Sequence, residues 1–248
     1  MAAAVKLHRH VGRRRAARLL AEGPNLVEAA LRRGLVSEVF ATEAAATRFA
    51  DLLAGAPVHL VTERAAKALS DTVTPVGLVA VCAMPEASLA AVLANAPRLV
   101  AVAADISEPG NAGTLIRLAD AMGADAVVLA GHSVDPYNGK CLRASAGSIF
   151  AVPVISDPDA ADVVDALAGA GLQVLATTLD GEVCLDDADL TPPTAWLFGP
   201  EAHGLSADLA AAATHRVRIP MPGHAESLNV ASAAAICLYQ SSRAHRRD

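Results

Sequence analysis

Three short segments of the chain carry polar side chains, glycine and proline in the combination that ligand-binding loops use. They read DISEPGNAGTLIR (105–117), WLFGPEAHGL (196–205) and VRIPMPGHAESLN (217–229). In each segment a short apolar run stops at turn-forming residues, and a helix is expected to follow. If the apolar runs are strands of one parallel sheet, the segments lie beyond its carboxyl edge, where such sheets bind their ligands.

The first segment can bring an amide and a guanidinium to that edge. Asn111 can cap the helix that follows, and Arg117 lies off the apolar stripe of the same helix. A guanidinium there can orient a reacting group and stabilise developing negative charge. It can equally be a surface side chain paired with Asp120. The segment matches neither GxGxxG nor the Walker pattern, so it lacks the signature of the nucleotide-phosphate loops.

The other two segments add a carboxylate, a hydroxyl and a second amide. Glu201 can be a functional acid or a solvated turn residue, and Ser227 can cap the final helix or face a ligand. Asn229 in the first turn of that helix is less expected, because Asn is a weak helix former. His203 and His224 lack HxH or HxxxH spacing, and the four cysteines form no CxxC pair, so no metal site is predicted.

The composition favours a cytoplasmic globular protein. The chain has 248 residues, of which 53% are hydrophobic and only 3% aromatic, so aliphatic side chains must form the core. No apolar run approaches the ~18 residues of a membrane span. The basic start is followed by no apolar segment, unlike a secretory signal. The widely separated cysteines are expected to be reduced and structural.

Positive charge is concentrated at the start of an otherwise acidic chain. The net charge of −6 argues against a protein that coats nucleic acid through overall charge. Residues 1–21 nevertheless contain six Lys or Arg and no acidic residue. This basic arm is either a solvated terminus or a surface that contacts phosphates. The candidate phosphate contacts are Arg9, Arg13, Arg14, Arg15, Arg32 and Arg33.

Expected strands alternate with expected helices along the chain. The first part begins with a helix that starts within 8–20 and a second helix that starts near Pro24 and ends at Gly34. It then alternates strands at 36–41, 58–61 and 77–83 with helices over 43–54 and from Thr62. The second part alternates strands at 99–103, 126–129, 152–155, 172–177, 195–198 and 216–219 with helices over 111–122, 138–148, 159–170, 206–212 and 227–242. This pattern predicts an α/β protein whose parallel sheet is covered on both faces. The loose segment 84–97 is the expected linker between domains 1–83 and 98–248.

Taken together, the three loops resemble the motifs of a known enzyme family. GNAGTLIR (110–117), FGPEAHGL (198–205) and IPMPGHAESLNVASAAAICLY (219–239) are similar, in order and spacing, to the motifs of the SpoU/TrmH class of SPOUT RNA methyltransferases. The resemblance covers about 99–240, and LLAEGPNLVEAALRRG (19–34) resembles the small ribosomal-protein-like substrate-binding domain of that family. Such enzymes methylate the 2′-hydroxyl of a ribose in rRNA or tRNA with S-adenosylmethionine.

The resemblance carries several implications about architecture and substrate. It implies a deep trefoil knot in the C-terminal domain, an exception to the rule against threaded chains. It also implies a homodimer. It extends to thiostrepton-resistance enzymes that modify 23S rRNA and favours rRNA over tRNA as the substrate.

The family pattern also assigns roles to individual residues. Its catalytic positions correspond to Asn111, Arg117, Glu201, Ser227 and Asn229. Its donor-binding positions, which act mostly through backbone groups, correspond to Thr177, Gly199, Ile219, Met221 and Leu228. Pro200 stands where the family often has a small polar residue. The family gives the arginine a part in activating the ribose hydroxyl. Since a guanidinium has a pKa above ~12, orientation and charge stabilisation are chemically easier roles than proton abstraction.

Two other functions stay open at the level of sequence. An RNA-binding or ribosome-assembly module that has lost catalysis would keep the same fold, although the presence of Arg117, Glu201 and Asn229 favours an enzyme. A nicotinamide-dependent dehydrogenase would share a doubly wound sheet, but the glycine fingerprint of that class is missing.

Overall fold

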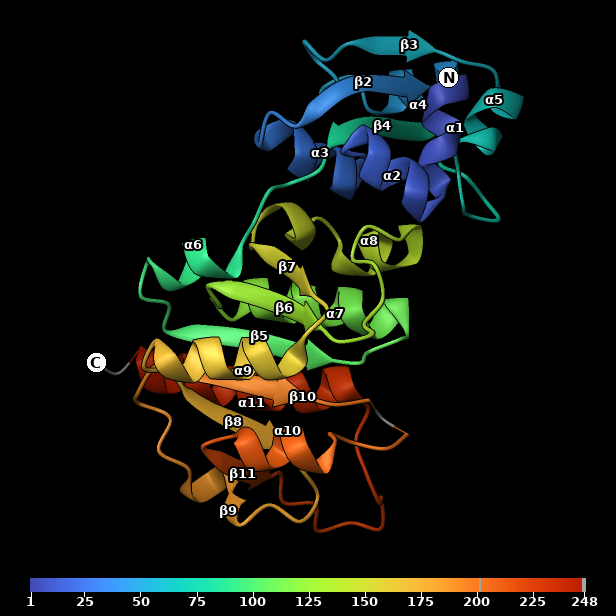
Figure 1. Cartoon of the computed structure of the whole chain (residues 1–248). Helices are drawn as coiled ribbons and strands as arrows, with labels where there is room; N and C mark the ends of the chain where they lie inside the picture. Colours follow the sequence, from blue (N-terminus) through green and yellow to red (C-terminus); the bar gives the residue numbers. More distant parts are fainter. Residues whose placement is uncertain (201, 247–248) are drawn as a thin grey trace.

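Two separate sheets organise the chain, one in each half (Figure 1). The computed structural model describes residues 1–200 and 202–246. Within these residues the first sheet has four strands in the order β1–β4–β2–β3, and the second has seven in the order β7–β6–β5–β10–β8–β11–β9. Segment 84–97 joins the two sheets and carries a short helix, α6 (Leu89–Leu93), which Ser88 caps. The first sheet lies at one end of the molecule, and β8, β9 and β11 lie at the other.

The first sheet is mixed. The antiparallel pairs are β1–β4 and β2–β4, and β2 pairs with β3 in parallel. The strands are β1 (Arg18–Glu22), β2 (Val36–Ala41), β3 (Val58–Leu60) and β4 (Leu78–Ala83). Short helices surround them: α1 (Ala2–Val5), α2 (His10–Ala16), α3 (Pro24–Arg32), α4 (Glu43–Arg48) and α5 (Glu63–Ala68).

Local signals placed several helix starts in this half correctly. Pro24 opens α3, and Thr42 caps α4 by accepting a hydrogen bond from Ala45 N at 3.2 Å. The expectation of one helix within 8–20 was wrong at its end. Ala17 takes a left-handed φ of 49°, which terminates α2, and the chain continues as β1. Because three successive residues of β1 are buried, this strand lacks the alternation that would have revealed it.

The second sheet is parallel throughout, which confirms the α/β prediction. Its central strands are buried on both faces, and such strands appear in a sequence as continuous apolar runs. Its strands are β5 (Leu99–Ala104), β6 (Ala126–Ala130), β7 (Val154–Asp157), β8 (Gln173–Thr177), β9 (Val183–Cys184), β10 (Thr194–Phe198) and β11 (His215–Arg218).

Helices cover both faces of this sheet. Along β5, Leu99, Ala101 and Ala103 join the hydrophobic cluster under α7 (Pro109–Ala121), α8 (Gly139–Ser145) and α11 (Val230–His245). The alternate residues Val100 and Val102 join the cluster under α6, α9 (Ala160–Gly169) and α10 (Ala207–Ala212). The strand period of two therefore divides β5 between two cores.

Strand order brings the three predicted loops to one edge. The chain builds β5, β6 and β7 outward in one direction, and β10 later inserts between β5 and β8. The order thus reverses beside β5 and β10, the position at which open parallel sheets bind ligands. Helix α11 packs back across the sheet, and Trp196 Nε1 on β10 donates a buried 2.8 Å hydrogen bond to Ser241 Oγ. The trefoil knot implied by the family resemblance stays a prediction.

Candidate active site

A cavity of about 730 Å³ lies at the carboxyl ends of β8, β10 and β11. Its walls come from residues 177–180 at the end of β8, residues 199–200 and 202–211 after β10, and residues 216–233 around and after β11. Leu205, Ile219 and Leu228 give it apolar surface, and its polar lining residues include Asp180, Arg216 and Glu226. This size and mixed lining are typical of sites for small organic ligands.

The structure brings to this cavity all five residues that were predicted to surround a methyl donor. They are Thr177, Gly199, Ile219, Met221 and Leu228, and Ser227 lines the cavity with them. The hydroxyl of Thr177 donates to Leu197 O at 3.1 Å, so its side chain is already used within the sheet. What Thr177 can offer a ligand is therefore its backbone, as the family pattern implies.

Glycine is required where the loop after β10 folds back on itself. A Cβ on Gly199 would lie 2.5 Å from Leu205 N and 2.6 Å from Gly204 C, which are impossible contacts. The loop is closed by a 2.8 Å hydrogen bond from Gly204 N to Pro200 O. Glu201, predicted to be catalytic, lies outside the described residues.

An amide pair connects the starts of α7 and α11. Asn229 Nδ2 donates to Asn111 Oδ1 at 3.1 Å, across 118 residues of sequence. The Oδ1 of Asn229 accepts from Ala231 N and Ser232 N, which makes Asn229 the cap of α11. The expectation that Ser227 caps this helix was wrong, because the chain first becomes helical at Val230.

A carboxylate that the sequence did not single out starts α7. Glu108 caps this helix by accepting from Gly110 N at 3.2 Å, so the predicted capping role of Asn111 was wrong. Lys140 Nζ lies 2.5 Å from Glu108 Oε1. The hydrogen bond from Lys140, followed by that from Gly110, lowers the pKa of Glu108 below its usual value. The Glu-Pro dipeptide before Gly110 is the sequence signal for this cap.

Two family models match the chain. Residues 2–80 match the MRM3-like substrate binding domain, and residues 98–239 match the SpoU rRNA Methylase family. The second match spans more than half of the chain. The chain belongs to the SpoU rRNA methylase family. This membership confirms the resemblance drawn from the three loops.

Individual relatives and solved structures agree with this membership. The chain is 38% identical over 236 residues to the 23S rRNA (guanosine(2553)-2'-O)-methyltransferase RlmP of Bacillus subtilis, an alignment that covers 94% of this chain and 92% of that protein. It is 39% identical over 142 residues to the 23S rRNA (uridine(2479)-2'-O)-methyltransferase of Streptomyces viridochromogenes, covering 55% of this chain and 50% of that protein. The crystal structure of the SpoU methyltransferase AviRb from S. viridochromogenes, in complex with the cofactor AdoMet, matches with a TM-score of 0.86 at 30% identity and covers 99% of this chain and 98% of its own.

Of the predicted catalytic residues that the structure describes in this SpoU family member, Ser227 lines the cavity, whereas Asn111, Arg117 and Asn229 do not. Arg117 lies on α7 with an exposed side chain. Within the described residues it forms no ion pair with Asp120, so the alternative interpretation as a local surface pair does not hold.

The basic arm of this SpoU protein is only partly available for RNA. Arg13 is 5% exposed and donates to Asp135 Oδ2 at 2.5 Å and to the carbonyl oxygens of Leu7 and His8 at 2.9 Å. The prediction that Arg13 contacts RNA phosphates was therefore wrong, because its guanidinium is used inside the protein. The other five candidates are exposed: Arg9, Arg14, Arg15, Arg32 and Arg33.

In residues 1–200 and 202–246, no group of three or more His, Cys, Asp or Glu is arranged to hold a metal ion. No helix in these ranges is long and apolar enough to cross a membrane. The four cysteines are free thiols, and burial raises the pKa of Cys82 and of Cys141 to about 12.

Proposed function

We propose that this chain transfers a methyl group from S-adenosylmethionine to a ribose 2′-hydroxyl in RNA, with rRNA as the substrate. The observation that carries the proposal is the cavity after β8, β10 and β11, which gathers residues from two of the three family motifs. Support also comes from relatives that are named 23S rRNA 2'-O-methyltransferases and from a structural neighbour solved with AdoMet. As an rRNA-modifying enzyme, the protein acts in the cytoplasm.

The cavity has the chemistry that an adenosine-containing donor needs. Leu205, Ile219 and Leu228 provide apolar surface for a flat base. The hydroxyl of Thr178, a cavity-lining residue, is buried without a hydrogen-bond partner among the described residues. A buried unpaired hydroxyl costs about 1–3 kcal/mol, and a polar group of a ligand can remove that cost. The residues present therefore fit S-adenosylmethionine.

The chain's own polar groups have distinct parts in this reaction. When bound, the donor supplies an electrophilic methyl group on a sulfonium sulfur. The amides of Asn111 and Asn229 hold each other at 3.1 Å and fix the starts of α7 and α11 beside the cavity. Ser227 and Glu201 are proposed to help orient the ribose. The guanidinium of Arg117 orients the ribose hydroxyl and stabilises the negative charge that develops on its oxygen, which requires no free base.

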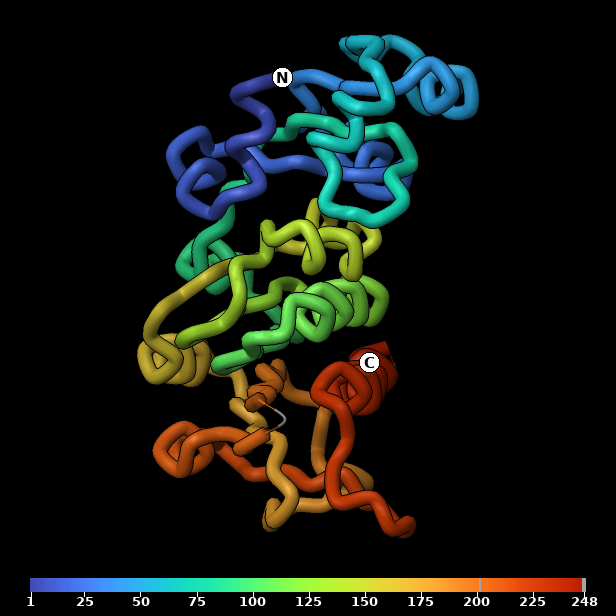
Figure 2. Tube along the Cα trace, turned by 90° about the vertical axis from the view of Figure 1, so that its right-hand side faces the viewer, coloured from blue at the N-terminus to red at the C-terminus, as the bar shows by residue number. Residues whose placement is uncertain are grey.

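We propose a homodimer because Arg117 does not line the cavity of its own chain. Helices α7 and α11 lie side by side (Figure 2). On α11 the apolar side chains Ile236 and Tyr239 are 36% and 48% exposed. Packing this surface against a second copy buries them and can bring Arg117 of one copy to the cavity of the other.

RNA is proposed to bind through the N-terminal domain and the exposed part of the basic arm. The match of residues 2–80 to a substrate binding domain supports this assignment. Of the predicted phosphate contacts, Arg9, Arg14 and Arg15 are exposed in the arm, and Arg32 and Arg33 extend the positive charge along the end of α3. Such contacts position an RNA without specifying its sequence.

Two measurements test the proposed function. Calorimetry of the full chain should show binding of S-adenosylhomocysteine and none of NAD; the reverse result would identify a nicotinamide enzyme. Mapping of ribose methylations in total RNA should show one lost when the gene is deleted and regained with the wild-type gene. Donor binding with an unchanged methylation map would instead indicate an RNA-binding module without turnover.

A further inference from the structure

Helix α8 is a shared layer between the N-terminal domain and the catalytic helix α7. Its contact with α7 is unusually close, because Gly113 of α7 faces Cys141 and Ala144. A Cβ on Gly113 would lie 2.3 Å from Cys141 O and 2.7 Å from Ala144 Cβ. Any displacement of α8 must therefore be transmitted to α7, which carries Asn111 and Arg117.

Glycines at both ends of α8 bring the N-terminal domain equally close. A Cβ on Gly139 would lie 2.5 Å from Asp71 Oδ2. A Cβ on Gly147 would lie 2.9 Å from Ala29 Cβ and 3.2 Å from Asn25 O, and Gly147 has a left-handed φ of 105°. The backbone around α8 thus touches the N-terminal domain at two separated points.

A buried ion pair joins the two domains just before α8. Arg13 of α2 pairs with Asp135, 122 residues away, and both side chains are largely buried. Asp135 Oδ1 also accepts from Tyr137 N at 2.9 Å, which fixes the loop that leads into α8. The hydroxyl of Tyr137 donates to Pro85 O at 3.3 Å in the interdomain segment. Burial, and then the charge of Asp135, raise the pKa of Tyr137 to about 12, so it stays a donor.

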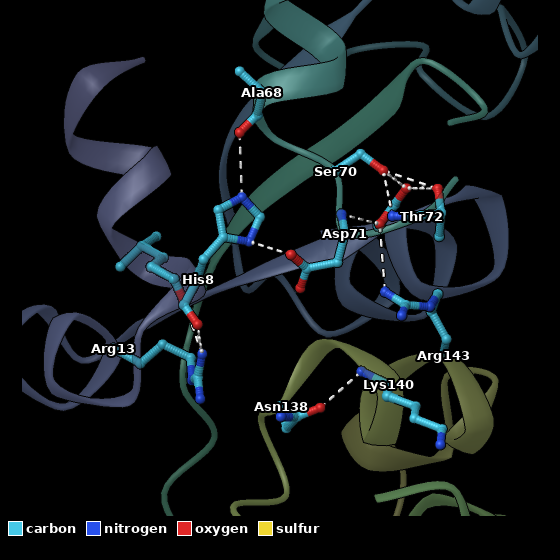
Figure 3. Close-up of polar contacts among 11 residues, drawn as sticks. His8, Arg13, Ala68, Ser70, Asp71, Thr72, Asn138, Lys140 and Arg143 are labelled. Atoms are coloured by element: carbon cyan, nitrogen blue, oxygen red, sulfur yellow. Dashed lines mark hydrogen bonds and ion pairs between the residues drawn. The ribbon is translucent and has the colours of Figure 1, made fainter. Parts of the chain in front are cut away.

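A second ion pair lies on the other side of the same contact (Figure 3). Arg143 Nη1 of α8 lies 3.5 Å from Glu22 Oε2 at the end of β1. Glu22 is itself held by the hydroxyls of Ser70 and Thr72 and by Asp71 N. The carboxylate is therefore fixed before it meets Arg143, which favours one relative orientation of the domains.

We propose that the ion pairs Arg13–Asp135 and Glu22–Arg143 form an interdomain clamp whose role is to position bound RNA relative to α7. The idea rests on the proposed function for its RNA. The N-terminal domain lies at the opposite end of the molecule from β8 and β11, whose loops form the cavity (Figure 1). A small rotation about α8 therefore displaces an RNA held by that domain by a much larger distance at the cavity.

The energetics favour positioning over plain stabilisation. Buried ion pairs contribute little net stability because desolvation offsets their attraction, but removal of one partner leaves an unpaired buried charge. The four charged residues do not line the cavity, so they act through the arrangement of the domains. They are positioning residues.

The test uses the full chain with Asp135→Asn, Arg143→Gln and the milder Glu22→Gln, which keeps an acceptor for Ser70 and Thr72. Arg48→Gln, on an exposed part of α4, is the matched control. Single-turnover methylation at saturating RNA should slow by up to about 10²-fold in the clamp variants, because misplacement of the reacting groups by about 1 Å has this effect. RNA affinity and S-adenosylhomocysteine affinity should stay at wild-type values. Arg13→Lys, which keeps the charge, should recover part of the rate relative to Arg13→Gln.

Hydrogen exchange provides a readout that needs no activity. Exchange in α2 and in residues 131–138 should increase in Asp135→Asn and not in Arg48→Gln. Unchanged exchange and an unchanged rate would overturn the clamp. A loss of RNA affinity at an unchanged saturated rate would also overturn it, because these side chains would then be RNA contacts. If the wild-type protein methylates no RNA, the proposed function fails, while the exchange experiment still decides whether the clamp exists.

Discussion

The cavity and the interdomain contact at α8 are built in opposite ways. The cavity is formed by loops that all lie between residues 177 and 233. The interdomain contact depends on charged side chains such as Arg13 and Asp135, which lie 122 residues apart. The first can be assembled from short contiguous motifs, whereas the second exists only when two domains meet. Substitutions in the cavity should therefore alter donor affinity, whereas substitutions at the interdomain contact should alter the rate of RNA methylation.

The largest expected effect comes from Arg117, which belongs to neither region in its own chain. Arg117→Ala should slow transfer by about 10²–10³-fold, because one group that stabilises developing charge is lost. Donor affinity should stay nearly intact, since the proposed contact of Arg117 is with the ribose hydroxyl and not with the donor. Single-turnover rates and calorimetry with S-adenosylhomocysteine check the two parts.

A subunit-mixing experiment shows whether Arg117 acts across a dimer. Gly199→Val should abolish donor binding, because even a Cβ at this position meets Leu205 N at 2.5 Å. Mixing Arg117→Ala with Gly199→Val should restore activity, since one site then has an intact cavity and an intact arginine. Absence of restoration in a verified mixed dimer would place Arg117 in the site of its own chain. Asp120→Asn, on the same helix, is the control and should behave like the wild type.

The next effect in size concerns the contact between α7 and α8. Gly113→Ala should destabilise the protein by about 1–3 kcal/mol through overpacking. Gly169→Ala is the matched control, because it lies in α9 and its new methyl group meets nothing within 4 Å. Urea unfolding of both variants measures the difference, and equal stabilities would show that α8 can move away from α7 without cost.

A smaller effect is expected from the basic arm. Arg14→Ala with Arg15→Ala should flatten the dependence of log RNA affinity on log salt by about 1.4 on single-stranded RNA, at ~0.7 per phosphate contact. Arg13 is excluded because it is buried against Asp135. The control is Arg48→Ala with Arg64→Ala, which removes the same charge from exposed positions of other helices. Identical slopes for the two double variants would make the arm a solvated terminus.

The smallest effect separates two interpretations of the unpaired hydroxyl in the cavity. If Thr178 pairs with the donor, Thr178→Val should weaken S-adenosylhomocysteine binding by about 0.5–1.5 kcal/mol, the usual net value of a hydrogen bond. If the hydroxyl has no partner in the complex either, the same change should leave affinity intact and raise the melting temperature. Calorimetry and thermal unfolding distinguish these results.

The sequence predicted the cavity well because its information is local. Thr177 is the last residue of β8, Gly199 directly follows β10, and Met221 lies three residues after the end of β11. Loops that follow neighbouring parallel strands lie at the same edge of the sheet, so the positions of these residues at or after strand ends place them in one site.

Residues whose role depends on distant partners were predicted less well. Arg13 looks like its neighbours Arg14 and Arg15, and nothing nearby in sequence indicates that Asp135 will bury it. The capping roles of Ser227 and Asn111 failed for a related reason. Several residues near each helix start can accept the same hydrogen bonds, and tertiary contacts decide which does: Asn229 also donates to Asn111.

The close contacts at Gly139 and Gly147 limit which N-terminal domains can replace the one in this chain. A substrate domain taken from a relative would have to present small or recessed surfaces where Asp71, Asn25 and Ala29 stand, or it would not seat on this catalytic domain. Recombination at the interdomain segment 84–97 alone should therefore yield chimeras whose halves fold but fail to dock. A chimera that docks should therefore take residues 135–147 from the same parent as the N-terminal domain, although these residues follow segment 84–97 in the sequence.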